Sequence, residues 1–444
     1  MNINNAKCNR NVAPVFLLIL ITITTSCLLP YQLDSIFGRN AGRELTLLIY
    51  MSADNELEPY ALEDMRALES SGLILPNISI LVLLDRPCGA QLYLVNTATE
   101  VNYGSITSPA LPLPELGLVE NGPVPVNMGN PESLKAFIRY SVSHYPAEQY
   151  GIIIWGHGSG WRFGGSTSDS AGLSLFRATS FDDGATDALY TAQLADALAE
   201  LPRISSSIWA VVAFECCSAM MMETLFEIRD LAEYAVGSQD VLASPGWDYA
   251  QFAEALRTVN ATSPFELANV LFTQFVDSCG GYEKAAFSVV DLSQLEALNQ
   301  RWNSLCHLIM DSFTEQEIQQ ILRPCLLYDV ESFFTVPGDL NIDMYNAAVV
   351  LRSRFPILTR ASFAVLVAIM DAVVLQYCSS NGNPDAGGIA IHFVPLDSNG
   401  AALLPHSQAY SDSSGLEDYS LQFIENSLWP PVTGGLLKSM WYQH

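Results

Sequence analysis

Short apolar runs that alternate with amphipathic segments constrain the fold of this chain more than any other feature. Continuous apolar runs of this length are typical of parallel strands that are buried on both faces of a sheet. The segments between them have helical periodicity, with a proline-led start at Pro131. The runs are 45–51, 78–85, 151–154 and 208–213, and the helical segments are 58–71, 131–144, 192–200 and 220–234. This alternation predicts an α/β fold with a mostly parallel sheet and helices on both faces.

The second half of the chain has a different pattern. A capped helix is expected from Pro264 to about Ser278. Two more helical stretches follow at 292–313 and 341–377, the second broken near Pro356, and a late buried strand covers 388–395. We therefore expect a core over residues 44–285 and a C-terminal helical and late-strand portion, 286–444, packed on that core.

A histidine and a cysteine each follow one of the predicted strands directly. His157 lies in Gly156-His157-Gly158 after the strand at 151–154, and Cys216-Cys217 follow the strand at 208–213. In open α/β sheets, chemistry takes place at the carboxyl ends of the strands. A cysteine paired with a histidine suffices for thiolate nucleophilic catalysis, because the histidine takes the thiol proton. The backbone N–H of Gly158 or of Cys217 could form an oxyanion hole.

Composition excludes some classes of function. The chain has 444 residues, half of them hydrophobic, which is ample for a large buried core. Its net charge of −27 argues against nucleic-acid binding and favours basic partners. The nine cysteines show no disulfide framework and no zinc-ligand spacing, so most are expected to be buried free thiols.

The N-terminus has the pattern of a targeting segment. Lys7 and Arg10 precede an apolar stretch at 15–23, which is short for a bilayer span, and small residues then lead to Cys27. We expect a signal peptide over 1–26, a lipidated Cys27 as in bacterial lipoproteins, and a tether over 27–43. An ordinary secretory signal with an incidental Cys27 is the second interpretation, and a single spanning helix is the third.

Several motifs, in order along the chain, resemble the clostripain family of cysteine peptidases, which have a caspase-like fold. They are Tyr50 to Leu57, Asn127 to Pro131, Gly156-His157-Gly158 with Gly160-Trp161, Phe214-Glu215-Cys216-Cys217, and Gly246-Trp247. The resemblance implies that His157 and Cys217 are catalytic. It also implies that Glu215 and Asp240 bind a basic substrate side chain, although Glu215 stands where the family has Asp. Strand alternation leaves Cys216 as a structural residue.

The resemblance carries further expectations. Some relatives are cut between the His and Cys strands, where Arg162 and Arg177 are candidate cut sites here. Some respond to calcium, which Asp182, Asp183 and Asp187 could bind, but acidic loop residues are more often merely solvated. We therefore assign no metal and no cofactor.

The sequence thus predicts an extracytoplasmic, membrane-anchored cysteine endopeptidase. A Cys–His dyad would cut a peptide or protein substrate after Arg, and less readily after Lys. A catalytically inactive surface-binding protein that keeps the fold is the alternative. A thiol enzyme other than a peptidase, such as an amidase or transpeptidase, is a third reading.

Overall fold

The structure is a computed structural model. It consists of two compact units, residues 1–43 and residues 44–444. Only parts of the second unit are described below. The described residues are 43–70, 77–95, 106–119, 122–158, 160, 180–182, 187–242, 246–259, 261–279, 285–322, 325, 327–329, 340–378, 385–393 and 421–429.

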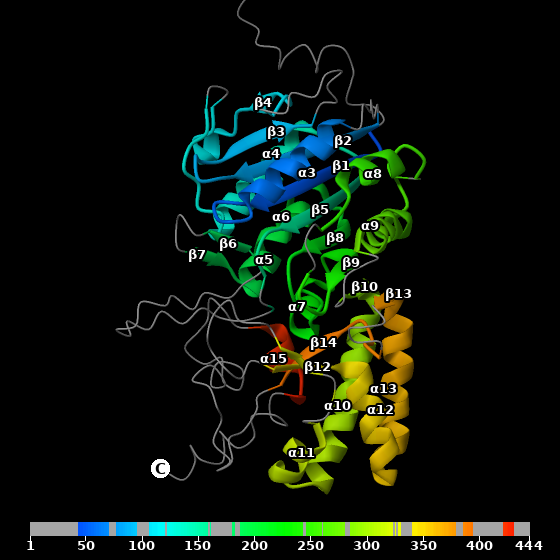
Figure 1. The fold of residues 1–444 in the computed structure, drawn as a ribbon. Helices are drawn as coiled ribbons and strands as arrows, with labels where there is room; N and C mark the ends of the chain where they lie inside the picture. The colour runs from blue at the N-terminus through cyan, green and yellow to red at the C-terminus, as the bar shows by residue number, and fades with distance from the viewer. Residues whose placement is uncertain are drawn as a thin grey trace, which may run out of the picture. The chain divides into compact units, whose positions relative to one another are not determined.

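The main sheet is mixed, with parallel strands at its centre (Figure 1). Its nine described strands run in the order β13-β10-β9-β8-β5-β1-β2-β3-β4. Strands β9, β8, β5, β1 and β2 pair in parallel, and the outer pairs are antiparallel. The bounds are β1 Leu45–Ser52, β2 Ile78–Asp85, β3 Gln91–Leu94, β4 Ala110–Leu111, β5 Gln149–Trp155, β8 Trp209–Glu215, β9 Ala232–Ser238, β10 Ala286–Asp291 and β13 Val373–Cys378. The predicted α/β class, with a mostly parallel sheet, is confirmed.

Helices cover both faces of this sheet. Alternate residues of β1 enter different cores, since Leu47 and Ile49 belong to one cluster and Leu48 and Tyr50 to the other. One cluster includes side chains of α3 (Glu58–Ser70), α8 (Tyr249–Ala255) and α9 (Pro264–Cys279). The other includes α4 (Pro131–His144), α5 (Thr191–Leu198), α6 (Glu200–Ser205), α7 (Met222–Ile228) and much of the C-terminal portion. Every residue of β1 is buried, as the unbroken apolar run predicts.

The C-terminal portion contributes to the main sheet as well as packing on it. Strand β10 pairs with β9, and β13 pairs with β10, so two strands from beyond residue 285 continue the sheet. Helices α10 (Leu295–Ser312), α12 (Met344–Arg354) and α13 (Thr359–Ala372) form a layer beside this edge (Figure 1). The remaining described helices there are α11 (Glu315–Leu322) and α15 (Gln422–Asn426).

Two smaller sheets complete the described strands. Strands β11 (Leu327–Asp329), β12 (Leu340–Asp343) and β14 (Ala390–Phe393) form an antiparallel sheet, and β6 (Ser180–Asp182) pairs with β7 (Asp187–Leu189). The predicted late strand is therefore present, but in a separate sheet. The expectation of helix up to Tyr377 is wrong, because Val373–Cys378 is strand β13, an edge strand whose half-buried and exposed residues alternate at first.

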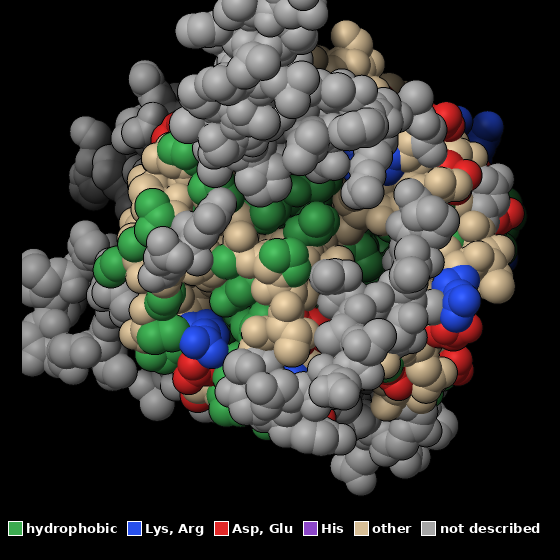
Figure 2. All heavy atoms as spheres, turned by 90° about the horizontal axis from the view of Figure 1, so that it is seen from above, with side chains coloured by type: hydrophobic (Ala, Val, Ile, Leu, Met, Phe, Trp, Pro, Cys, Tyr) green, Lys and Arg blue, Asp and Glu red, His purple; other side chains and the backbone are tan. Residues whose placement is uncertain are grey.

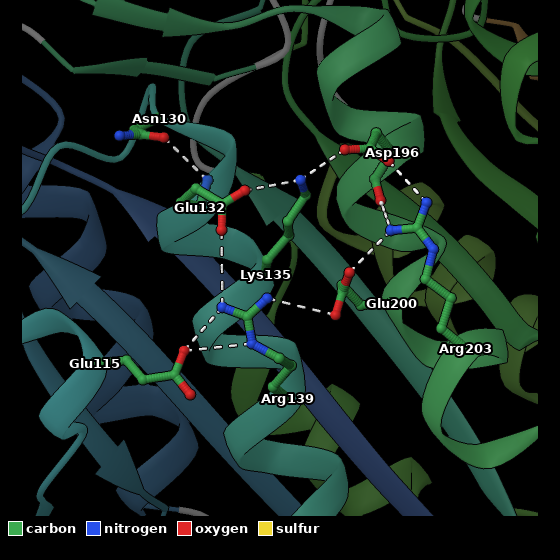
Figure 3. A network of polar contacts seen from close by, with 8 residues as sticks. All are labelled: Glu115, Asn130, Glu132, Lys135, Arg139, Asp196, Glu200 and Arg203. Carbon is green, nitrogen blue, oxygen red and sulfur yellow. Dashed lines mark hydrogen bonds and ion pairs between the residues drawn. The ribbon is translucent and has the colours of Figure 1, made fainter.

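Surface charges are mostly arranged in opposite pairs on the faces in view. From above, hydrophobic side chains lie toward the middle, and basic side chains lie beside acidic ones nearer the rim (Figure 2). Figure 3 shows such a network between α4 and the α5–α6 segment. Lys135 contacts Asp196 at 2.6 Å, and Arg139 contacts Glu200 at 3.4 Å. These pairs join α4 to α5 and α6, three helices that cover the same face of the sheet. Among the described residues, no helix is long and apolar enough to cross a membrane.

Candidate active site

The register of two neighbouring strands brings His157 and Cys217 to the same point of the sheet edge. Strands β5 and β8 pair in parallel, with Trp155 opposite Glu215. The N–H of Gly156 then donates to the Glu215 carbonyl at 3.2 Å. His157 and Cys217 each come two residues after this matched pair, so they leave the sheet side by side. The strand-end placement inferred for the two residues is therefore what the structure shows.

Gly158 packs directly on the cysteine segment. A Cβ atom at this position would lie 2.6 Å from the carbonyl oxygen of Cys217 and 2.9 Å from Sγ of Cys216. No larger residue fits without moving backbone, so glycine at 158 allows the two segments to touch. Gly156 has φ +148° and lies close to the Ser52 carbonyl, which also favours glycine.

The turn after the cysteine is held in an unusual conformation. Ser218 has φ +55°, which is uncommon for a residue other than glycine. Its N–H donates to the carbonyl of Asp240 at 3.0 Å. The strand end of β8 is thus tied to the segment that follows β9, and both segments border the cysteine.

Cys217 lies in a partly covered position. Its Sγ accepts a hydrogen bond from the N–H of Leu242 at 3.3 Å. Burial raises the pKa of the Cys217 thiol, and the nearby Asp240 carboxylate raises that pKa further. The thiol is therefore protonated at neutral pH in this conformation. Chemistry at Cys217 requires a base, and His157 is the neighbouring group that can take the proton.

His157 has a partner that the sequence did not reveal. Its Nε2 lies 3.0 Å from Oε1 of Glu56, in the loop after β1. The His157 side chain is one-third exposed, and that of Glu56 is 60% exposed. In the sequence, Glu56 is marked only by its place in the Tyr50 to Leu57 motif. The position of Glu56 could have predicted this contact. Glu56 follows β1, β1 is the neighbour of β5, and the carboxyl ends of parallel strands lie at the same edge of the sheet.

Glu215 does not fit the expected role of substrate contact. Its side chain is buried, and its carboxyl group accepts hydrogen bonds from the N–H of Trp247 at 2.9 Å and from the hydroxyl of Tyr249 at 2.5 Å. Side chains alternate along β8, so Glu215 enters the core that contains Trp247 and Tyr249. Both carboxyl oxygens are used to join β8 to the start of α8.

Burial leaves Glu215 protonated at neutral pH. Desolvation raises the pKa of Glu215 to about 8. Asp64 of α3 lies in the same region, where it accepts a hydrogen bond from Nε1 of Trp155 at 3.0 Å. Burial first, and then the charge of Glu215, raises the pKa of Asp64. The pKa values of two neighbouring carboxyls beneath the sheet edge are thus raised, because burial disfavours the charged form of each.

Asp240 lies at the same edge as Cys217, on the segment after β9. It is buried to 6% exposure, and its Oδ1 accepts from the N–H of Val241 at 2.7 Å. Its charge acts on the Cys217 thiol, as described above. The structure thus brings Asp240 to the candidate nucleophile, whereas it turns Glu215 into the core.

The residue before Asp240 is anchored to the C-terminal portion. Nε2 of Gln239 donates to Oδ2 of Asp343 at 2.8 Å, and the N–H of Gly388 donates to Oε1 of Gln239 at 2.9 Å. Asp343 also accepts from the N–H of Gly387 and caps α12 through the N–H of Asn346, both at 2.7 Å. These groups fix the Asp240 segment from a part of the chain more than a hundred residues away. Motif analysis gave no sign of this network.

Other predicted residues lie outside the described part of the chain: Cys27, Arg162, Arg177 and Asp183. Asp187 accepts a hydrogen bond from Asn127 at 2.7 Å. No group of three or more His, Cys, Asp and Glu side chains suited to a metal occurs among the described residues. Of the described cysteines, Cys216, Cys306 and Cys325 are buried free thiols, Cys217 and Cys378 are partly exposed, and Cys88 is exposed.

Comparisons with known proteins agree with the motifs. A sequence model described as the Clostripain family matches residues 49–350. Clostripain from Hathewaya histolytica is 26% identical over 257 residues, which are 52% of this chain and 46% of that protein. The chain therefore spans about half the length of this curated relative.

Solved structures of low identity share the fold. A secreted C11 cysteine protease from Bacteroides thetaiotaomicron, bound to an irreversible peptide inhibitor, has a TM-score of 0.59 at 18% identity and covers 85% of this chain and 98% of its own. An inactive zymogen C11 protease from Parabacteroides distasonis has a TM-score of 0.57 at 20% identity and covers 78% and 91%. The caspase-like architecture inferred from the motifs is confirmed by these likenesses.

Proposed function

This chain belongs to the clostripain family, and we propose that it is an extracytoplasmic cysteine endopeptidase that uses Cys217 as nucleophile and His157 as base. The observation that carries the proposal is the β5–β8 register, with Trp155 opposite Glu215 and each catalytic residue two positions later. The packing of Gly158 against the Cys217 carbonyl supports it.

The chemistry follows from these positions. His157 takes the thiol proton of Cys217, and the thiolate attacks the carbonyl carbon of the scissile peptide bond. The resulting oxyanion is stabilised by the backbone N–H of Gly158 or of Cys217. His157 then gives the proton to the leaving amine, which departs and leaves a thioester. A water molecule, deprotonated by His157, hydrolyses the thioester and restores the thiol.

The charge near Cys217 favours substrates with a basic residue before the scissile bond. Asp240 supplies a carboxylate beside Cys217, as its effect on the pKa of that thiol indicates. An Arg side chain could bind such a carboxylate bidentately, whereas Lys offers a point charge, so we expect Arg to be preferred. Glu215 is the weaker candidate, since its carboxyl group already bonds Trp247 and Tyr249.

The test is direct. The purified protein is incubated with matched fluorogenic peptides that end in Arg, Lys, Asp or Ala before the reporter. Cleavage after Arg at a rate at least tenfold above that after Ala, abolished in Cys217→Ala, is expected. No cleavage of any peptide, by either the intact protein or protein cut within 159–179 and with or without calcium, would contradict the proposal. Product analysis on longer peptides separates hydrolysis from transpeptidation.

One observation favours the alternative of an inactive surface-binding protein. The Cys217 thiol is covered and bonded by the N–H of Leu242, so it is not poised to react in this conformation. Cleavage of the chain within 159–179, at Arg162 or Arg177, is the event that we expect to release it. Two results together would favour the binding role. Protein cut at Arg162 or Arg177 would remain inactive as a peptidase, and the Cys217→Ala variant would keep the function of the parent protein.

A further inference from the structure

Exposed apolar side chains are concentrated on one part of the C-terminal helices. Six large hydrophobic residues between 349 and 374 are exposed, and only five others are in the rest of the described chain. Phe363, Val367 and Met370 follow one another at spacings of four and three residues, so they share one side of α13. They are 52%, 41% and 68% exposed. The six are Val349, Ile357, Phe363, Val367, Met370 and Val374; we call Phe363, Val367 and Met370, which share one side of α13, the α13 face.

The opposite side of α13 is already occupied. Val365, Leu366 and Ile369 are buried in the core, and α10 and α12 flank the helix. A helix that is apolar on all sides is normally buried on all sides. Here the outer side faces water, so the α13 face has the character of a contact surface.

The segment that carries this face is basic. Residues 344–372 contain three arginines, Arg352, Arg354 and Arg360, and a single acid, Asp371, in a chain of net charge −27. None of the three makes an ion pair with a described carboxylate. Lys135, Arg139 and Arg203, by contrast, each contact at least two. The guanidinium of Arg352 instead lies over the Phe363 ring, 5.1 Å from its centroid.

Exposed apolar side chains, together with arginines that make no ion pair with a described carboxylate, favour one kind of partner. Helices that lie at a lipid–water interface insert apolar side chains between the headgroups, and their basic residues contact anionic lipids. A second copy of the chain fits less well, because a two-fold contact through this face would bring the two basic segments together. We infer that the α13 face docks on an anionic lipid surface and orients the protein there.

The experiment compares matched variants on lipid vesicles. The parent is the full chain with Cys27→Ala, so that no acyl chain on Cys27 contributes. One variant adds Phe363→Ser, Val367→Ser and Met370→Ser, and a second adds Arg352→Gln, Arg354→Gln and Arg360→Gln. A control variant adds Ile204→Ser, Ile208→Ser and Phe265→Ser, three exposed hydrophobic residues elsewhere. Partition onto phosphatidylglycerol and phosphatidylcholine vesicles is measured over a range of lipid concentrations.

We expect both α13 variants to lower partition onto the anionic vesicles about tenfold or more, since each arginine near such a surface is worth roughly a fivefold change. The control should match the parent, and zwitterionic vesicles should bind all four weakly. Because the N-terminus is common to all four proteins, its own affinity cancels in the ratios. Equal thermal midpoints of unfolding will show that the variants fold alike, as exposed sites predict.

Three results would overturn the inference. The first is equal partition of the parent and the α13 variants. The second is a concentration-dependent dimer of the parent, in vesicle-free buffer, that the substitutions abolish, since the face would then join two protein copies. The third is protection of a Met370→Cys thiol from maleimide in solution, which would mean that another segment of the chain covers the face.

Discussion

Nε2 of His157 lies 3.0 Å from Oε1 of Glu56. The two residues come from neighbouring parallel strands, β5 and β1, so the contact spans the strand-end edge. With Nε2 engaged by a carboxylate, Nδ1 is the ring nitrogen left for the Cys217 thiol. In the reaction that we propose, Glu56 would act through the orientation of His157, as a positioning residue.

Substitution Glu56→Gln tests this role. We expect kcat to fall about two- to fivefold with KM unchanged, because an exposed ion pair is worth at most about 1 kcal/mol. The measurement is kcat and KM at low and high salt. Salt should slow the parent toward the variant, because it screens the pair, and should leave the variant unaffected. Glu63→Gln, an exposed acid on α3, is the matched control. A change in KM alone would mean that Glu56 contacts substrate instead.

His157 and Cys217 should behave as one unit. Either change to Ala should lower kcat/KM by about 10⁴-fold, and the double variant should be little worse, because members of a catalytic pair are not additive. Cys216→Ala should keep most activity, since that thiol is buried beside the strand end. Single-turnover assays on an Arg peptide measure all four proteins. An inactive Cys216→Ala with an active Cys217→Ala would show that the nucleophile is misassigned.

Glu215→Gln distinguishes a structural from a substrate-binding carboxyl group. Because the pKa of Glu215 is raised to about 8, the group is neutral at pH 7 and Gln resembles it closely. We expect nearly unchanged kcat/KM on both Arg and Ala peptides. Glu215→Leu should lower both equally, since the N–H of Trp247 and the hydroxyl of Tyr249 lose their acceptor. A selective loss on the Arg peptide in Glu215→Gln would restore Glu215 as the substrate contact.

The same carboxyl group should make stability depend on pH. The folded state holds its proton up to about pH 8, whereas the unfolded chain releases it near the ordinary pKa of 4.5. Between these values the folded state binds more protons, so this contribution to the free energy of unfolding falls as pH rises. Urea unfolding of the parent and Glu215→Gln from pH 5 to 8 measures it. A difference between the two proteins that does not vary with pH would contradict the assignment.

Asp343 should stabilise the Gln239 and Gly387 segments as well as the helix that it caps. Asp343→Ala leaves the side-chain amide of Gln239 and the N–H of Gly387 without an acceptor and removes the cap of α12. We expect a loss of about 2–4 kcal/mol in the free energy of unfolding. Asp371→Ala, on the exposed side of α13, should change it by less than about 0.5 kcal/mol. Urea unfolding provides both values, and equal effects would show that the network is dispensable.

Cys27→Ala addresses the expected anchor. Because acyl chains supply most of the membrane affinity of lipoproteins, the variant should move from the membrane fraction to the soluble fraction of cells washed at high salt, which screens the contact of the arginines with anionic lipid. Mass spectrometry of the mature N-terminus provides the independent measurement. An unmodified terminus at another residue would leave Cys27 without this role.

The sequence predicted the parts that depend on local pattern. Apolar runs such as Leu45–Met51 predicted the central strands, because a strand buried on both faces has no polar alternation. Edge strand β13 was mistaken for helix, since Val373–Cys378 continues the apolar pattern of α13 and only pairing with β10 decides its state. Motifs placed His157 and Cys217, but the direction of the Glu215 side chain and the Gln239–Asp343 contact depend on tertiary packing that no local spacing encodes.

Strand β10 covers the edge of β9, and β13 in turn covers β10. A chain that ended near residue 285 would present β9, the strand that leads to Asp240, as an unpaired edge. Open edges of this kind template pairing with other chains, which leads to aggregation. During synthesis the chain is therefore vulnerable to such pairing until residue 378 is present, and a protease that removed the C-terminal portion would leave an aggregation-prone remnant.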